Sequence, residues 1–294
     1  MRLIYLGMGG PLSSVPLRHL LQSGYRFSAV VIAAPRKEIA WRKLPQPGGT
    51  AHPLSLISPP HSVLQLAWEH EIPLYEAGDL QSVEAQRALR LLRPDVALVS
   101  CFAYRIPESM LRLPSHGFFN LHPSRLPAYR GPYPLFWQLR DGLREVGLTA
   151  HALDEGLDTG PIALQETAQL QDGMEAADIE TLLGQRGGRM FDRLLQTLQR
   201  GELTLRAQKG NGSYQGRPGE GDFALDRRWS ARRAYNFMRG TADWGRPYTL
   251  PIDGRRQQLH RALGFEPRGE QADPIVEGER ALRIQFSPGI LEAI

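Results

Sequence analysis

The sequence predicts an α/β protein with a Rossmann-like, mostly parallel sheet, followed by a smaller β-rich domain of the open-barrel kind. Short apolar runs alternate with helix-like stretches in the first half, and those runs are hydrophobic on both faces, as strands of a covered parallel sheet are. Late in the chain the segments become short and strand-like. A chain of 294 residues is long for a single core. We therefore predict a catalytic domain at residues 1–205 and a second domain at 206–294.

The first half supplies these strands and helices in alternation. Apolar, β-branched runs predict buried strands at residues 2–7, 27–34 and 96–100. Apolar residues at helical spacing predict helices at residues 16–22, 62–71 and 82–92. Between them, residues 35–60 are rich in proline and glycine without a period, which indicates a long surface loop.

The rest of the chain continues the pattern and then changes it. After Gly117 we expect a strand leading into the sequence HPSRLP, a helix near residues 134–142, and strands at 148–153 and 162–166. Residues 175–200 predict a long helix, although Gly187 and Gly188 weaken its middle. An irregular linker is expected at residues 211–221. The β-rich domain follows, with strands at 248–252, 257–262, 275–277 and 282–286 and a turn at Asp253-Gly254.

Composition excludes several classes of protein. The chain is 41% hydrophobic and 22% charged, an ordinary globular balance. Its apolar runs are far shorter than the roughly 20 residues that span a bilayer, and its start lacks a signal-peptide cleavage pattern. The single cysteine, Cys101, excludes an internal disulfide and a cysteine-rich metal site. We expect a cytoplasmic protein with no membrane partner and no DNA partner.

The charge leaves two interpretations open. The net charge is +4, and all but three of the 35 basic residues are arginines. An arginine-rich proteome explains this composition, whereas a functional surface would attract a phosphate-bearing partner, because guanidinium groups bind phosphate oxygens in pairs. Basic residues do gather late in the chain, at Arg227, Arg228, Arg232, Arg233, Arg239, Arg255, Arg256 and Arg261.

Glycines near the start suggest a dinucleotide-binding turn, but the pattern fails. Gly7, Gly9 and Gly10 follow the first strand, yet the third glycine of the G-x-G-x-x-G pattern falls at Leu12. The acidic residue expected at the end of the second strand is also missing. A tight turn from strand to helix explains these glycines better.

The chemically informative segment is residues 117–160. On a strand, alternate residues share a face, so Asn120 and His122 project together near the carboxyl end of a parallel strand, where ligands bind. Asp158 approaches from a second strand end, in the glycine-flanked sequence DEGLDTG. These three side chains suit the addition of a nucleophile to a carbonyl. His122 exchanges protons near neutral pH, Asn120 donates to a developing oxyanion, and Asp158 orients the imidazole and favours its protonated form, or takes a proton from an incoming amine.

Other residues of the chain fit alternative chemistry less well. Cys101 follows an adjacent strand and acts as a nucleophile only beside a histidine; a core cysteine is the simpler interpretation. His151 and Asp154 are interpreted as polar residues at a sheet end. A zinc site of His116, His122 and His151 lacks the usual ligand spacing, so we predict no metal.

These residues also resemble a known family. The elements Asn120-Leu121-His122, HPSRLP at residues 122–127, Tyr129-Arg130-Gly131 and DEGLDTG at 154–160 resemble, in order and spacing, the 10-formyltetrahydrofolate-dependent formyltransferases. The likeness extends loosely from residue 1 to 201 through SCFAYRIP at residues 100–107, and residues 222–239 are weakly similar to the second domain of family members.

The resemblance implies a function and a set of site residues. It implies that Asn120, His122 and Asp158 catalyse formyl transfer from the co-substrate 10-formyltetrahydrofolate to a primary amine. It also implies folate contacts, which we expect from Ser124, Arg125, Leu126, Pro127, Phe102, Tyr104, Ile106, Asp154, Gly156 and Leu157. One departure is Arg125, where the family usually has leucine.

Three hypotheses remain open: two concern the acceptor amine, and the third concerns a function without catalysis. An aminoacylated initiator tRNA, methionyl-tRNA, is favoured by the two-domain layout and the late arginines. A nucleotide-linked amino sugar or another small amine is favoured by the sequence PYP at residues 132–134 and by Phe136-Trp137. A non-catalytic folate- or RNA-binding relative is the third, and it has no need of all three catalytic side chains.

Overall fold

A computed structural model gives the fold and describes residues 1–46, 62–252, 254–278 and 280–294. The chain forms two compact units. The first comprises residues 1–130, 147–167 and 180–213, and the second comprises 131–146, 168–179 and 214–294. The units take segments from several parts of the chain, and the division into domains at residues 205 and 206 stays a proposal. No helix in these described ranges is long and apolar enough to cross a membrane.

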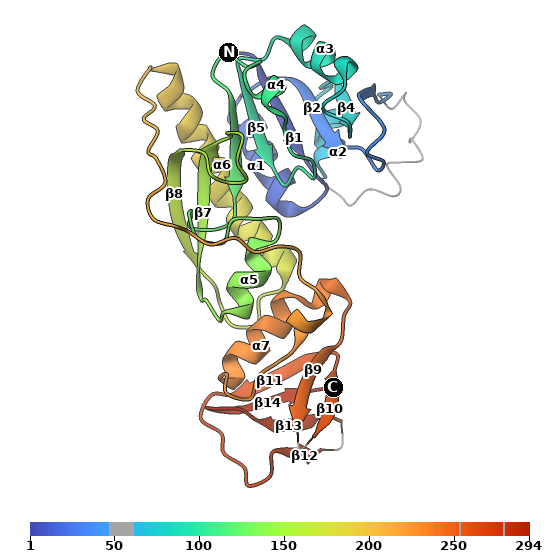
Figure 1. The fold of residues 1–294 in the computed structure, drawn as a ribbon, viewed down its shortest axis with the longest axis vertical. Coiled ribbons are helices and arrows are strands. Elements are labelled where there is room, and N and C mark those ends of the chain that lie inside the picture. Colours follow the sequence, from blue (N-terminus) through green and yellow to red (C-terminus); the bar gives the residue numbers. More distant parts are fainter. Residues whose placement is uncertain (47–61, 253, 279) are drawn as a thin grey trace. The chain divides into compact units, whose positions relative to one another are not determined.

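The main sheet has the strand order β3-β4-β2-β1-β5-β6-β7-β8. Its five central strands, β4, β2, β1, β5 and β6, run parallel. At the two sides of this group, β3 pairs antiparallel with β4 and β7 pairs antiparallel with β6. The strands are β1 (Leu3–Gly7), β2 (Phe27–Ala33), β3 (Arg42–Lys43), β4 (Leu74–Ala77), β5 (Val96–Ser100), β6 (Phe118–His122), β7 (Glu145–Ala152) and β8 (Ile162–Gln169). Figure 1 shows β1, β2, β4 and β5 side by side. The predicted Rossmann-like, mostly parallel sheet is confirmed.

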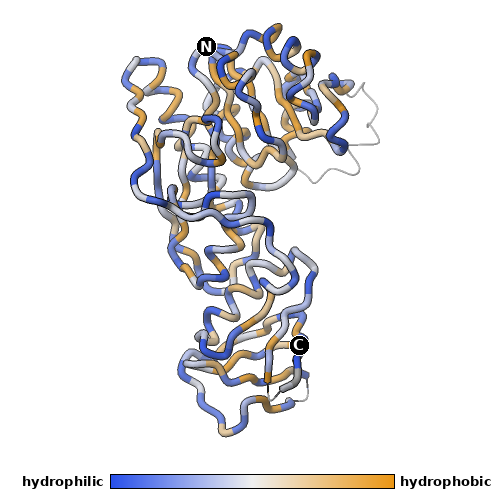
Figure 2. Tube along the Cα trace, viewed as in Figure 1, coloured by the Kyte–Doolittle hydropathy of each residue, from blue (hydrophilic) through white to orange (hydrophobic). Residues whose placement is uncertain are grey.

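Helices bury the sheet because its central strands are apolar on both faces. Alternate residues such as Ile4 and Leu6 of β1 pack against Ala85 and Leu89 of α3 (Val83–Leu92). Buried residues of α1 (Pro11–Gln22) and α2 (Val63–Glu69) add to the core of this unit. In Figure 2 the central strands are among the most hydrophobic parts of the tube. This core holds the strand ends that carry the polar residues of the site.

Helix boundaries follow local capping chemistry. The hydroxyl groups of Ser62 and Ser82 accept hydrogen bonds from the first turns of α2 and α3. The first helix begins at Pro11, five residues before the predicted start, because proline at the first position fits a helix N-terminus. A short helix, α4 (Glu108–Leu111), and the strand β4 were not predicted. Residues 47–61 of the predicted long loop lie outside the described residues.

The long helix α6 (Ala176–Gln199) confirms the predicted helix at residues 175–200 and explains its two central glycines. A Cβ atom at Gly187 would collide with the Leu121 side chain of β6, and one at Gly188 would collide with His19 of α1. The two glycines therefore permit close packing, and they do not interrupt the helix.

The second unit is β-rich, as predicted, but its elements differ in detail. A hairpin joins β9 (Tyr248–Ile252) and β10 (Arg255–Leu259), and a four-stranded antiparallel sheet joins β11 (Ala262–Glu266), β14 (Ile290–Ala293), β13 (Leu282–Gln285) and β12 (Ile275–Glu277). The predicted strand at 257–262 is therefore wrong, because the chain changes sheets between β10 and β11. Asp253 of the predicted turn lies outside the described residues.

Two α-helices among the described residues lie wholly within this unit. One is α5 (Pro134–Arg140), near the predicted position. The other, α7 (Ala231–Gly240), begins at a Ser230 cap and buries Ala234, Phe237 and Met238 at helical spacing. This helix was not predicted, because its many arginines obscure a narrow apolar stripe. Aromatic side chains form the core beside it, among them Phe136, Phe223, Phe237 and Tyr248.

Candidate active site

Asn120 and His122 come from the last residues of β6, as expected. Both alternate positions lie on one face of the strand. His122 is buried, with 4% of its surface exposed, and Asn120 is half-buried. Asp158 lies in the loop between β7 and β8 and is also buried. The structure therefore brings together the three side chains that the sequence singled out.

His122 is held at both ring nitrogens. Its Nε2 lies 2.8 Å from the carbonyl oxygen of Tyr129, and its Nδ1 lies 3.5 Å from Oδ1 of Asp158. Because a carbonyl oxygen only accepts hydrogen bonds, Nε2 carries a proton in this arrangement. Nδ1 is then the basic position of the neutral ring, and it faces a carboxylate.

His151 also belongs to this cluster, although the sequence indicates only a polar residue at a sheet end. In the antiparallel pairing of β6 and β7 it lies directly opposite Asn120. Its Nε2 is 3.3 Å from Nδ2 of Asn120 and 3.6 Å from Oδ1 of Asp158. Its Nδ1 is 3.0 Å from the Ala152 carbonyl oxygen. Only the strand register reveals this contact, since 31 residues separate His151 from Asn120.

Burial decides the charge of His122. Desolvation lowers the pKa of this imidazole below its ordinary value of 6.5, and the nearby His151 lowers it further. The Asp158 carboxylate and the Tyr129 carbonyl raise the pKa, but they do not compensate for burial. The expectation that Asp158 keeps His122 protonated is therefore wrong for the free protein, in which the imidazole is neutral at pH 7.

The segment expected to contact folate just after β6 forms a tight turn. Ser124 is fully buried, and its hydroxyl donates to the Ala128 carbonyl oxygen at 2.7 Å. The Arg125 side chain is exposed, whereas Leu126 is buried and its peptide bond to Pro127 is cis. Gly147 of β7 is needed here, because a Cβ atom would collide with the Arg125 backbone. Of these four residues, Arg125 and the half-buried Pro127 have side chains accessible to a ligand.

The expected residues after β5 surround the end of that strand. Phe102 and Tyr104 are half-buried, with ring centroids 6.1 Å apart, and Ile106 is buried in the core below them. The Tyr104 hydroxyl donates to the Ala34 carbonyl oxygen at 2.7 Å, which fixes its ring. The two partly exposed rings meet edge to face, at 73°, and provide an apolar aromatic surface that a fused heterocycle can contact.

The expected residues before Asp158 form an exposed loop. One carboxylate oxygen of Asp154 accepts from the Gly156 amide at 3.1 Å and from the Thr159 hydroxyl at 2.7 Å. Leu157 is 45% exposed. Asp154 therefore shapes the loop, and Gly156 and Leu157 present its outer surface.

The alternative chemistries find little support in the geometry. Cys101 is exposed as a residue and has a left-handed φ of 56°, yet desolvation raises the pKa of its thiol to about 12, which does not suit a thiolate nucleophile. His116 precedes β6 while His122 ends it, so the strand separates two of the three residues of the zinc hypothesis. Within the described residues, no group of three or more histidine, cysteine, aspartate or glutamate side chains is placed to hold a metal ion.

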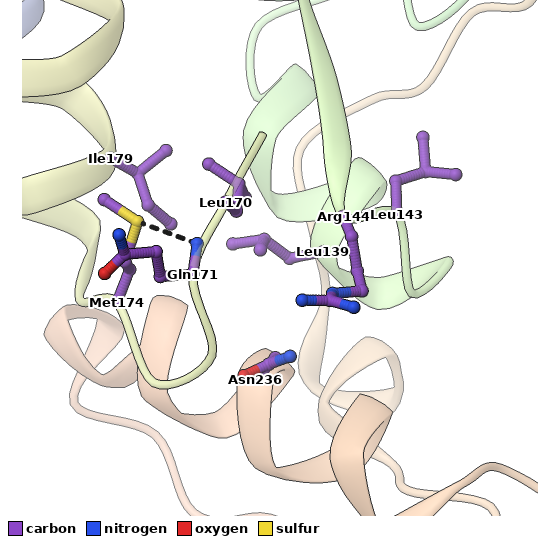
Figure 3. Close-up of a pocket in the computed structure, with 8 residues that line it drawn as sticks. All are labelled: Leu139, Leu143, Arg144, Leu170, Gln171, Met174, Ile179 and Asn236. Atoms are coloured by element: carbon purple, nitrogen blue, oxygen red, sulfur yellow. Dashed lines mark hydrogen bonds between the residues drawn. The ribbon is translucent and has the colours of Figure 1, made fainter. Parts of the chain in front are cut away.

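A hollow of the second unit does not take a substrate. Figure 3 shows it, lined by Leu139, Leu143, Arg144, Leu170, Gln171, Met174, Ile179 and Asn236. Its volume of about 10 Å³ is close to the space that one water molecule needs. We attribute this hollow to imperfect packing.

The family follows from a comparison with known proteins. Residues 27–192, more than half of the chain, match the family model described as formyl transferase. The chain belongs to the formyl transferase family. The match includes Asn120, His122 and Asp158, so the resemblance predicted from short motifs holds over residues 27–192.

Similar curated proteins extend beyond that domain. The chain is 30% identical to a methionyl-tRNA formyltransferase of Geobacter sulfurreducens over 98% of its own length and 86% of that protein. It is 34% identical to the methionyl-tRNA formyltransferase of Thermus thermophilus, with 91% of this chain and 81% of that protein covered. The similarity thus includes most of the second unit.

Solved structures share the fold at lower sequence identity. An N-formyltransferase from Helicobacter canadensis, crystallised with folinic acid and dTDP-3-aminofucose, matches with a TM-score of 0.69 and 16% identity, covering 100% of this chain and 98% of that one. A methionyl-tRNA formyltransferase from Clostridium thermocellum matches with a TM-score of 0.55 and 14% identity, covering 100% and 99%. These matches confirm the predicted fold class.

Proposed function

We propose that this protein transfers the formyl group of 10-formyltetrahydrofolate to the amine of methionyl-tRNA. The observation that carries the proposal is the convergence of Asn120, His122 and Asp158 within one largely buried cluster that includes His151. Membership of the formyl transferase family supports the same reaction. The expected cytoplasmic location is part of this proposal.

The reaction needs two hydrogen-bond donors for the formyl oxygen. When an amine adds to the formyl carbon, that oxygen gains negative charge, and donors placed beforehand stabilise it. Nδ2 of Asn120 supplies one donor. The Nε2–H group of His122, oriented in the free protein by the Tyr129 carbonyl, supplies the second, and the formyl oxygen competes with that carbonyl for the proton.

The reaction also needs a place for the amine proton. A carbon–nitrogen bond forms to the acceptor, the bond from the formyl carbon to the folate nitrogen breaks, and one proton passes from the first nitrogen to the second. Nδ1 of neutral His122 is the basic atom beside Asp158, and it points away from an oxygen held at Nε2. We therefore assign the first acceptance of the amine proton to the Asp158 carboxylate, which passes it to Nδ1 across 3.5 Å and stabilises the imidazolium.

The folate contacts expected from the sequence remain part of the proposal. Phe102 and Tyr104 offer a partly exposed aromatic surface, and Gly156 and Leu157 offer an exposed loop. The side chains of Ser124, Leu126 and Ile106 are buried, so we assign them to shaping the pocket and not to direct contact. Arg125, exposed beside this turn, and the half-buried Pro127 complete the expected contacts, and Asp154 holds the loop of Gly156 and Leu157.

The acceptor assignment rests on sequence similarity and on the second unit. Three relatives that are 30% to 32% identical over 97% to 98% of this chain are named methionyl-tRNA formyltransferases. A nucleotide-linked amino sugar is the second candidate, since a structural neighbour was crystallised with one. Phe136 no longer favours that candidate, because it is buried among Phe223, Phe237 and Trp244, where it packs the core.

A direct comparison of acceptors tests this proposal. Purified protein is supplied with 10-formyltetrahydrofolate and either methionyl initiator tRNA or dTDP-3-aminofucose, and tetrahydrofolate release is followed. We expect release that depends on methionyl-tRNA, with a rate at least 10²-fold above that with the sugar. Turnover with the sugar alone would replace the acceptor and keep the formyl-transfer chemistry. No turnover with either acceptor would refute the proposed function.

A further inference from the structure

A segment after the long helix α6 contacts both loops of the candidate site. We call residues 206–213 the strap. The strap belongs to the same compact unit as Asn120, His122 and Asp158, although it falls beyond the predicted catalytic domain. Its first residue, Arg206, pairs with Ile162 through two main-chain hydrogen bonds of 2.8 and 2.9 Å. This pairing anchors the strap beside the start of β8.

The far end of the strap holds the loop that orients His122. Ser213 donates its amide to the Pro127 carbonyl oxygen at 3.1 Å, and its own carbonyl oxygen accepts from the Arg130 amide at 2.9 Å. The Ser213 hydroxyl accepts from the Tyr129 amide at 2.8 Å. These bonds surround the residue whose carbonyl oxygen contacts Nε2 of His122.

The middle of the strap holds the loop that carries Asp158. The side-chain amide of Gln208 donates to the carbonyl oxygens of Asp158 and Gly160, both at 2.8 Å. Its side-chain oxygen accepts from Nε of Arg130 at 3.2 Å and from Nη2 of Arg130 at 2.7 Å. One side chain therefore connects the Asp158 loop to the loop of Tyr129 and Arg130.

Both loops need such support. Tyr129 and Asp158 have left-handed φ angles of 57° and 55°, a conformation that residues other than glycine keep only when their surroundings hold them in it. If either loop relaxed, the partner atom at one ring nitrogen of His122 would move. The four hydrogen bonds of Gln208 join the two loops, because two reach the carbonyl oxygens of Asp158 and Gly160 and two reach the Arg130 guanidinium.

We propose that Gln208 is a positioning residue, which fixes the Asp158 carboxylate relative to His122. The formyl-transfer part of this inference rests on the proposed function. A displacement of about 1 Å in a reacting group costs up to about 10²-fold in rate, so the loss of Gln208 should lower kcat by about that factor and leave KM for both substrates within about twofold.

Two substitutions separate the two halves of the Gln208 side chain. Gln208→Leu removes all four hydrogen bonds. Gln208→Glu keeps an acceptor for Arg130 but places a carboxylate oxygen against two carbonyl oxygens, so it loses only the contacts to the Asp158 loop. Gln86→Leu is the matched control, because it removes one contact from a glutamine side chain of helix α3 to the main-chain carbonyl of Gln81. Thermal unfolding is recorded for every variant.

The decisive readout needs no substrate. The pKa of the His122 imidazole is measured by NMR titration of the free protein. The titratable groups that face this ring are Asp158, whose charge raises the pKa, and His151, whose charge lowers it. We expect Gln208→Leu to lower the pKa of His122 relative to wild type, and Gln86→Leu to leave it unchanged. The new carboxylate of Gln208→Glu itself raises that pKa, so this variant is compared through kcat.

Each outcome is informative. A lower pKa of His122 in folded Gln208→Leu, with a fall in kcat of about 10²-fold in both Gln208 variants, supports the proposal. Variants that lose only thermal stability, with the wild-type pKa and kcat at a permissive temperature, overturn it and leave a structural role. If the wild-type protein transfers no formyl group, the titration still decides the role of Gln208, so the two proposals fail separately.

Discussion

Asn120 lies directly across the antiparallel strand pair from His151, and Nδ2 of its amide is 3.3 Å from Nε2 of that imidazole. The Ala152 carbonyl oxygen accepts from Nδ1 of His151, so Nε2 is the acceptor for the amide. One N–H bond of the Asn120 amide therefore points across the strand pair to His151. Because the amide group is planar, this contact also fixes the direction of its second N–H bond. His151 is fully buried, so this contact excludes water.

A change of His151 should therefore reduce the rate through Asn120. His151→Leu removes the acceptor and leaves the amide free to rotate, so we expect kcat to fall by roughly 10-fold to 10²-fold with little change in KM. Steady-state kinetics with both substrates check this result. His116→Leu, an exposed position before β6, is the matched control. Equal rates in wild type and His151→Leu would remove the positioning role of His151.

Substitution of Asn120 tests the oxyanion donor itself. Asn120→Ala removes the donor, and we expect kcat to fall by about 10²-fold to 10³-fold. Asn120→Asp keeps the size of the side chain but offers a carboxylate to a developing negative charge, so it should be at least as inactive. Folding is checked by circular dichroism. An Asn120→Asp protein that retains the wild-type rate would contradict the assigned role.

Substitution of Asp158 changes the pH dependence in a defined direction. Asp158→Asn removes the negative charge that raises the pKa of His122, so that pKa falls further below 6.5. Neutral His122 is the active form in our mechanism, so wild-type activity is lost as the pH falls through this pKa. In Asp158→Asn the same loss should occur at lower pH, with a maximal kcat about 10²-fold below wild type. The profile of kcat against pH is the measurement, with Asp79→Asn as a control outside the site. An acidic limb at the wild-type pH would show that Asp158 does not act on His122.

Salt dependence tests the RNA acceptor. Several late arginines already have partners: Arg228 pairs with Asp226, Arg232 with Asp172 and Arg239 with Glu175. Arg217 and Arg246 are exposed instead and stack on Tyr133 and Phe223, with no acidic partner within 4 Å in the described ranges.

If methionyl-tRNA is the acceptor, its affinity should fall steeply with salt. Each of Arg217→Ala and Arg246→Ala should flatten the slope of log affinity against log salt by about one unit if that arginine contacts a phosphate. Arg228→Ala should have a smaller effect, since Asp226 already neutralises that charge. Binding is measured by filter retention between low and moderate salt. An affinity that does not depend on salt would contradict an RNA acceptor.

The sequence predicts most of the catalytic unit because its signals are local. Strand alternation alone places Asn120 and His122 on one face, and the glycine-flanked motif around Asp158 identifies the loop that reaches them. The glycines of α6 were ambiguous, because only the packing of Leu121 against Gly187 explains them.

The contacts that were missed depend on pairing across long stretches of chain. His151 joins Asn120 through the strand register, and Gln208 reaches Asp158 across 50 residues. The charge of His122 was also misjudged, because the sequence shows its carboxylate partner but not its burial. In the second unit, the apolar stripe of α7 is narrow and the rest of the helix is rich in arginine, so the helical spacing of its apolar residues is a weak signal in the sequence.

The most direct test of the central claim is the transfer of a labelled formyl group to methionyl-tRNA by wild-type protein and by His122→Ala. Both ring nitrogens of His122 take part in our mechanism, one as a donor to the oxyanion and one as the base. We therefore predict that wild-type protein formylates methionyl-tRNA and that His122→Ala, folded and with unchanged tRNA affinity, is slower by at least about 10³-fold in a single turnover. A wild-type rate of transfer by folded His122→Ala would contradict the account.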